Sequence, residues 1–141
     1  MKIIALILAA ELVASGRVGQ VQNQPVDVRS LRDKVSIRMH QTVTFAFDER
    51  GDRLVNPRVA HGKQKQPTVT LELTDEIRGM STLIVTSTFP RMLQYHAGAH
   101  FSGKPTFQIA VAQPVHPKAT EAAGFPGSID EFVLWDLRVT K

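Results

Sequence analysis

The sequence feature that most constrains the fold is residues 35–47, V-S-I-R-M-H-Q-T-V-T-F-A-F, where apolar and polar side chains alternate. Successive side chains of a β-strand point to opposite faces, so this stretch predicts a strand with one apolar and one mostly polar face. The six apolar side chains of the first face would contribute roughly 9–18 kcal/mol of gross transfer free energy if fully buried. The stretch therefore predicts the organising strand of a small core. Gln41 is the only polar residue on the apolar face, so we expect an edge, a sheet crossing or a buried hydrogen bond there.

Similar alternation recurs along the rest of the chain, and turn-forming Gly, Pro, Asp and Asn residues separate the alternating segments. These segments are residues 54–60, 68–74, 80–89, 92–97, 107–111 and 129–140. With about seven strands and no convincing long helix after residue 16, the pattern predicts an all-β fold, an antiparallel β-sandwich of immunoglobulin-like type. A closed barrel of seven or eight strands would give the same alternation. Residues 113–128 hold three prolines and two glycines and are predicted to be irregular, with at most one helical turn at 118–123.

The N-terminus has the layout of a secretory signal peptide. Lys2 precedes an apolar run at residues 3–10, and small residues follow at 13–16. The run is too short to span a bilayer, which takes about 20 apolar residues, so no transmembrane anchor is expected. We therefore predict a signal helix at 1–16, a flexible or partly extended tether at 17–34 and a β-sandwich domain at 35–141, in a secreted or periplasmic protein. A single lysine and the interrupting Glu11 leave an N-terminal amphipathic helix or a buried strand as alternatives.

Composition excludes several functional classes. The chain has 17 basic and 13 acidic residues, a formal charge of +4, and no run of five or more basic residues, so a nucleic-acid-binding arm is not indicated. It contains no cysteine, which excludes a disulfide framework, a zinc ribbon, a cysteine nucleophile and a cysteine-ligated copper centre.

Histidines are the one candidate set of metal ligands. His96 and His100 would lie about 13 Å apart on a straight strand, at roughly 3.3 Å per residue, which is too far for one metal ion. They could share Zn or Cu only if residues 97–99 formed a tight turn, with His61 or His116 as a third ligand. The alternative is that all four are surface or loop histidines, with no cofactor in the protein.

Motifs for hydrolytic or phosphate chemistry are missing from the sequence, which has no G-x-S-x-G, H-E-x-x-H or Walker loop. Tyr95 and Trp135 fall on apolar faces of their segments, so both are predicted to belong to the core rather than to a ligand platform. We therefore expect a protein that is not an enzyme. A catalytic site assembled from distant strands stays open as an alternative.

The C-terminal half resembles small uncharacterised secreted proteins of proteobacteria. The residues that carry the resemblance are L-Q-Y-H-A at 93–97, Q-P-V at 113–115 and I-D-E-F-V-L-W-D-L-R-V at 129–139. The resemblance implies export and an all-β domain, and it carries over no activity and no catalytic residue.

Together these features predict an exported, non-enzymatic protein that binds a partner protein or an envelope component. Loops carry most binding residues in proteins of this kind, so the expected contact regions are 61–67, 98–105 and 113–128. The alternative function is that of a periplasmic metal-binding protein that uses the clustered histidines.

Overall fold

The computed structural model describes residues 18–140, so the predicted signal peptide lies outside the described part of the chain. The described residues form ten strands and one short 3-10 helix, and their strand pairs are antiparallel throughout. The strands are β1 (Gln20–Val26), β2 (Val35–Arg38), β3 (Thr42–Arg50), β4 (Arg53–Val59), β5 (Thr68–Thr74), β6 (Met80–Ser87), β7 (Met92–Phe101), β8 (Phe107–Val111), β9 (Ala119–Pro126) and β10 (Ile129–Thr140). The prediction of an all-β antiparallel fold is confirmed. In residues 18–140, no helix has the length and apolar character needed to cross a membrane.

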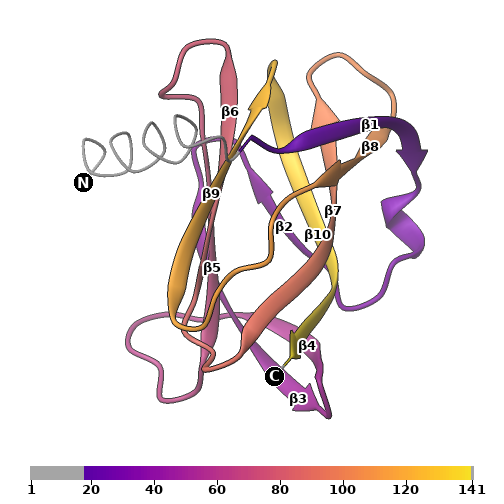
Figure 1. The fold of residues 1–141 in the computed structure, drawn as a ribbon. Coiled ribbons are helices and arrows are strands. Elements are labelled where there is room, and N and C mark those ends of the chain that lie inside the picture. The colour runs from indigo at the N-terminus through magenta and orange to yellow at the C-terminus, as the bar shows by residue number, and fades with distance from the viewer. Residues whose placement is uncertain (1–17, 141) are drawn as a thin grey trace.

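All ten strands belong to one sheet that curls almost onto itself. Its order is β1-β8-β7-β10-β4-β3-β5-β6-β9, and β2 pairs with β10 beside this path. The two ends of the sheet meet just before β1, where the Gly19 amide donates to the Gly124 carbonyl of β9 at 3.0 Å. Figure 1 shows β1 crossing from the end of β9 to β8 at the top of the molecule. The architecture is therefore barrel-like, and its two ends are joined at Val18 and Gly19, just before β1, which contact Gly124 of β9.

The prediction of about seven strands in an immunoglobulin-like sandwich needs correction, because ten strands share a single sheet. The long strand β10 is the physical reason. Along one edge it pairs with β7; along the other it pairs first with β2 and then, at Arg138, with β4. One continuous strand thus joins what would otherwise be two separate sheets.

The predicted organising strand at 35–47 is divided into β2 and β3 by a corner at residues 39–41. His40 takes a left-handed backbone conformation (φ 68°), and its amide donates to the Leu73 carbonyl of β5 at 2.8 Å. Gln41 lies at this corner, where its side-chain oxygen accepts the Arg38 amide at 3.0 Å. The chain leaves β10 here and joins β5, so it changes its partner strand within one sheet rather than crossing between two sheets. Gln41 itself is exposed rather than buried.

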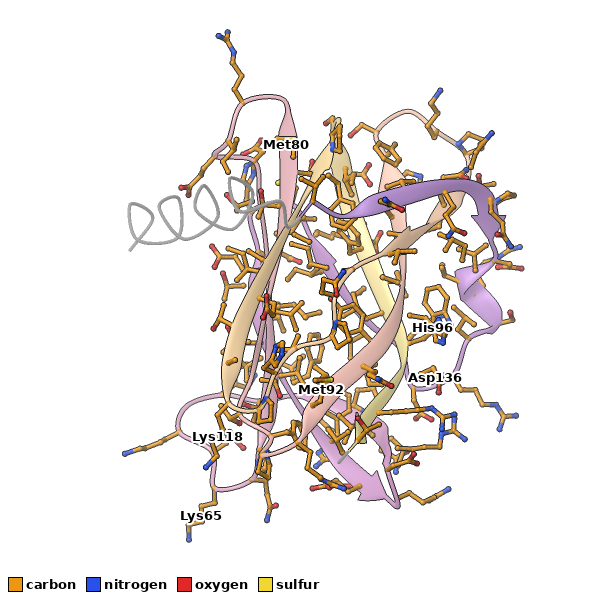
Figure 2. The ribbon with its side chains drawn as sticks, viewed as in Figure 1. Lys65, Met80, Met92, His96, Lys118 and Asp136 are labelled. Carbon is orange, nitrogen blue, oxygen red and sulfur yellow. The ribbon has the colours of Figure 1, made fainter. Side chains whose placement is uncertain are left out.

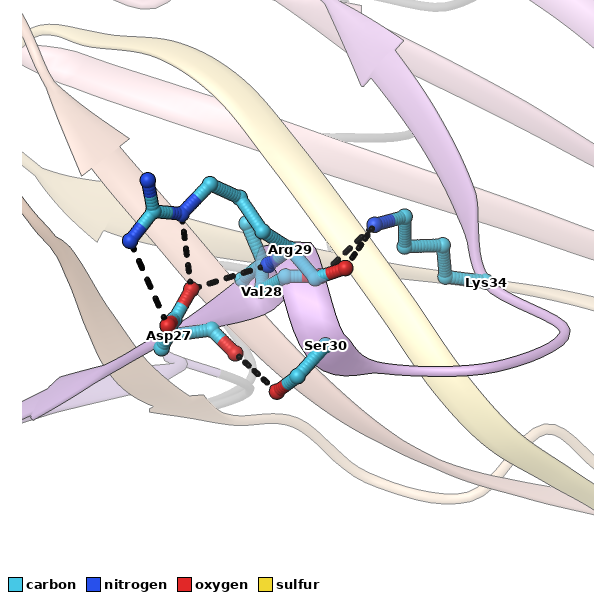
Figure 3. Close-up of polar contacts among 5 residues, drawn as sticks. All are labelled: Asp27, Val28, Arg29, Ser30 and Lys34. Carbon is cyan, nitrogen blue, oxygen red and sulfur yellow. Dashed lines mark hydrogen bonds and ion pairs between the residues drawn. The ribbon is translucent and has the colours of Figure 1, made fainter.

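Residues 17–34, expected to be a flexible or partly extended tether, contain β1 and the 3-10 helix η1 (Val28–Ser30). β1 pairs with β8, and Val21 packs against the core. Asp27 caps η1 by accepting the Arg29 amide at 3.1 Å, and Lys34 Nζ donates to the Val28 carbonyl at 2.7 Å (Figure 3). These contacts fix the connection that carries the chain from β1 to β2.

Residues 119–126, predicted to be irregular, form β9, which pairs with β6 over its whole length. Pro114 and Pro117 come before β9, and Pro126 is its last residue. No proline therefore interrupts the hydrogen bonding between β9 and β6. Long-range pairing with the buried strand β6 thus outweighs the weak local strand preference of A-T-E-A-A-G.

The faces of β10 also differ from the prediction. Asp136 has a left-handed backbone (φ 51°), and the register between β10 and β7 shifts between Trp135 and Arg138. This bulge reverses the alternation: Leu134 is buried before it and Leu137 after it. As a result Trp135 lies on the outer face and is partly exposed, so its prediction as a core residue is wrong.

Candidate functional site: a pocket at the seam of the sheet

The four histidines predicted as metal ligands do not converge. The tight turn at 97–99 that His96 and His100 would need is absent, because these residues pair with β10 and β8 as regular strand. His61 lies in the loop between β4 and β5, and His116 lies between β8 and β9. Three of the four contact different carboxylates: His96 with Asp136 (3.4 Å), His100 with Asp130 (2.6 Å) and His116 with Glu121 (3.4 Å). In the described part of the chain, no group of three or more His, Asp or Glu could hold a metal ion.

A pocket of about 180 Å³ lies where the sheet fails to close between β8 and β9. We call it the seam pocket. It is lined by residues 18–20, 111–113 and 121–123 together with Leu83 and Tyr95. At one end of this gap, the hydrogen bond between Gly19 and Gly124 closes the sheet. At the other end the sheet stays open beside Gln113, because β8 ends at Val111. The pocket therefore exists because β8 is short and β1 meets β9 only briefly.

Strand register directs two polar side chains into this pocket. Glu121 is opposite Val85, and Ala123 is opposite Leu83, so Glu121 shares the inner face of β9 and β6 with buried apolar residues. Tyr95 alternates with buried Leu93 and Ala97 and so lies on the inner face of β7. The small side chain of Ala123 next to Glu121 on this face leaves the space that the pocket occupies.

The electrostatics of the seam pocket follow from burial of these two groups. Burial raises the pKa of the Tyr95 phenol above its usual range, and the charge of Glu121 raises this pKa further. Tyr95 therefore stays a neutral phenol, able to donate one hydrogen bond and to accept others. The Glu121 side chain is only 13% exposed, and its Oε1 lies 3.4 Å from His116 Nδ1.

The seam pocket presents hydrogen-bonding groups and one carboxylate to a ligand. Its lining includes one carboxylate, one neutral phenol and the amides of Gln20 and Gln113. None of the described lining residues is Ser, Thr, Cys, Lys or Arg, so the lining supplies neither a hydroxyl or thiol nucleophile of the usual kind nor a cation. What it offers is hydrogen bonding and negative charge in a partly dry space.

Tyr95 and Glu121 were not predicted as site residues. Tyr95 was placed on an inner face correctly, but nothing in the sequence pairs it with Glu121, 26 positions away. A local signal did exist at Glu121, because Glu121, Ala123 and Phe125 alternate with Thr120, Ala122 and Gly124. Recognising that alternation as a strand would have placed a carboxylate on an inward face.

Comparison with known proteins adds no assignment to this geometry. No protein-family model matches the chain, and neither a curated protein nor a solved structure matches it.

Proposed function

We propose that the chain is an exported, non-enzymatic binding protein and that the seam pocket is its ligand site. The proposal narrows the three expected contact loops to one, because residues 113 and 121–123 of the pocket belong to the region 113–128. The observation that carries it is the combination of a carboxylate and a neutral phenol in a pocket of about 180 Å³ whose described lining has no cationic side chain.

The chemistry of the lining favours a ligand with a small cationic or hydrogen-bond-donating group. Glu121 would accept from such a group, and Tyr95 and Gln113 would add neutral hydrogen bonds. A charged hydrogen bond inside a partly dry pocket is stronger than one formed in water. An anionic ligand would instead meet the Glu121 carboxylate, and like charges at close range repel.

Export supports the proposal from the sequence side. A secretory signal at 1–16 would place the pocket where the ligand comes from outside the cytoplasm, as a free solute or as part of an envelope component. Detection of a cleaved N-terminus in exported protein by mass spectrometry tests this half of the proposal. An intact Met1 in all soluble protein would contradict it.

The pocket itself is tested by isothermal titration of the full chain at neutral pH with butylammonium and with butyrate, which have similar size and opposite charge. We expect heat of binding from butylammonium only, and at least tenfold weaker binding to Glu121→Gln, equivalent to about 1.4 kcal/mol. Glu72→Gln is the matched control, because Glu72 is also a half-buried strand glutamate but lies outside the pocket. Equal affinity for the two ions, or equal loss in the control, would contradict the proposal.

A further inference from the structure

A second site candidate lies on the opposite face of β7, where two adjoining hollows border Tyr95, His96 and Ala112. The larger hollow measures about 370 Å³ and includes Gln94, Asp136 and Arg138, and the smaller measures about 110 Å³ and includes Trp135. We call the two together the outer hollow. Figure 2 shows His96 and Asp136 close together beside β7 and β10. The larger volume is within the range of small-molecule sites, which begins near 300 Å³.

The first feature of the outer hollow is an aromatic pair. Trp135 and His96 are direct cross-strand neighbours, and their rings lie 6.0 Å apart with an interplanar angle of 22°. Gly98 lies beside the indole, since a Cβ built there would be in ordinary contact with Trp135 Cζ3 at 3.4 Å and in tighter contact with Val26 Cγ1 at 3.2 Å. The ring pair, together with Ile109 and Val111 of β8, thus offers a partly exposed apolar surface in the smaller hollow.

The second feature is a pair of opposite charges held beside these rings by the bulge in β10. Asp136 adopts the left-handed backbone conformation, which costs free energy for a residue other than glycine and is enriched at binding sites. This conformation brings its carboxylate 3.4 Å from His96 Nε2 and 3.0 Å from Arg138 Nε. The Asp136 side chain is 28% exposed and lines the larger hollow, so a ligand there can reach it.

The balance of charge decides the class of ligand. Arg138 contacts Asp136 and also lies 3.8 Å from Asp52, so an anionic ligand would approach two carboxylates together with the arginine. A cationic ligand would meet the guanidinium. A neutral ligand with several hydroxyl groups is repelled by neither the carboxylates nor the guanidinium. Its hydroxyls can accept a hydrogen bond from Arg138, donate one to Asp136, and donate to or accept from the Gln94 amide.

We propose that the outer hollow binds a neutral sugar ring. Such a ring has a C–H face, which packs on the surface of Trp135 and His96, and a rim of hydroxyls, which hydrogen-bond to Asp136, Arg138 and Gln94. The outer hollow shares Tyr95 and Ala112 with the lining of the seam pocket, but none of the residues proposed to hold the sugar lines that pocket. The proposal therefore does not depend on the function proposed for the seam pocket.

Trp135 is the only tryptophan in the chain, so its fluorescence reports on the outer hollow alone. The full chain is titrated with the methyl glycosides of glucose, galactose, mannose and N-acetylglucosamine up to roughly 0.1 M, well above a millimolar dissociation constant. We expect saturable change in Trp135 emission with at least one glycoside. Asp136→Asn, which keeps a side chain that tolerates the left-handed backbone, should weaken this binding at least fivefold.

The matched control is Asp75→Asn, because Asp75 also contacts a surface histidine, His40, at 2.7 Å but lies far along the sheet on the β5 side. This control should bind the glycoside as the unmodified chain does. Chemical-shift mapping of Gln94 and His96 gives a second readout that does not rely on fluorescence. No saturable change with any of the four glycosides, or unaltered binding by a folded Asp136→Asn variant, would overturn the proposal.

Discussion

Tyr95 and His96 are neighbours in β7, yet they belong to two different environments. Tyr95 faces inward, where burial and the Glu121 charge raise the pKa of its phenol. His96 faces outward, where its side chain is 66% exposed and contacts Trp135 and Asp136. One strand therefore borders a partly dry pocket on one face and a more open hollow on the other. The comparison suggests different ligands for the two sides: a small cation or donor inside, and a hydroxyl-rich ring outside.

The two sides should differ most in how much stability the protein loses when a glycine on each side is replaced by alanine. A Cβ at Gly19 would lie 2.2 Å from the Phe125 ring, whereas the contacts of a Cβ at Gly98 are 3.2 Å or longer. Because Phe125 is fully buried, Gly19→Ala should overpack the seam and lower the free energy of unfolding by about 1–3 kcal/mol. Gly98→Ala meets the end of a valine side chain and should cost less than about 1 kcal/mol. Chemical denaturation of both variants tests this order, and a larger loss for Gly98→Ala would contradict it.

The next largest effect on stability is expected from substitutions of Asp136, at the bulge in β10. A β-branched residue in the left-handed region costs about 1–2 kcal/mol, so Asp136→Val should destabilise the fold by that amount. Asp136→Gly removes the backbone strain together with the contacts to His96 and Arg138, so its stability should stay within about 0.5 kcal/mol of the original. The two variants lose the same carboxylate, and equal unfolding free energies by denaturation would show that the backbone conformation is not the cause.

The bulge also marks the limit of what the sequence could predict. Alternation at 35–47 and 68–74 gave strands with the correct buried side, because the period of two is a local property. At 107–111 it gave a strand but not its buried side, since Ala110 is buried there and Val111 is exposed. It failed at Trp135, since one residue in the left-handed conformation reverses every side chain beyond it. The sequence has apolar residues on both faces of 129–140, with Phe132 and Leu134 on one and Val133 and Leu137 on the other, but nothing in it marks a change of register between them.

The seam pocket was beyond local patterns for a different reason. Tyr95 and Glu121 come from strands that are not hydrogen-bonded to each other, and the space between them depends on where β8 ends. Such a gap is a property of sheet closure, which requires the order of all ten strands. The four candidate histidines were likewise separated by topology, since a regular β7 keeps His96 and His100 apart.

The smallest expected effect on stability comes from replacing His100, which also faces outward on β7. The hydrogen bond with Asp130 raises the pKa of His100 above its ordinary value, despite partial burial. Since folding raises this pKa, protonated His100 stabilises the fold below about pH 6.5, and the contribution is lost as pH rises through the higher folded pKa. His100→Gln should therefore lower stability by up to about 1 kcal/mol near pH 6 and by less near pH 9.

Asp130→Asn serves as the matched variant for this pair, because it removes the acceptor and leaves the imidazole in place. Like His100→Gln, this variant should lose more stability near pH 6 than near pH 9, as measured by urea denaturation at both pH values. A pH-independent difference between His100→Gln and the original chain would show that the ion pair does not stabilise the fold.

The central claim, that a small cation binds inside the seam beside Tyr95, is tested most directly by the two aromatic signals of the chain. Tyr95, the only tyrosine, borders both sites, whereas Trp135, the only tryptophan, lines the outer hollow and not the seam pocket, so Trp135 emission distinguishes the two sites. We expect butylammonium at neutral pH to perturb the ultraviolet absorption of Tyr95 saturably and to leave the emission of Trp135 unchanged. A change in Trp135 emission with an unaltered Tyr95 spectrum would place the cation outside the seam pocket and contradict the claim.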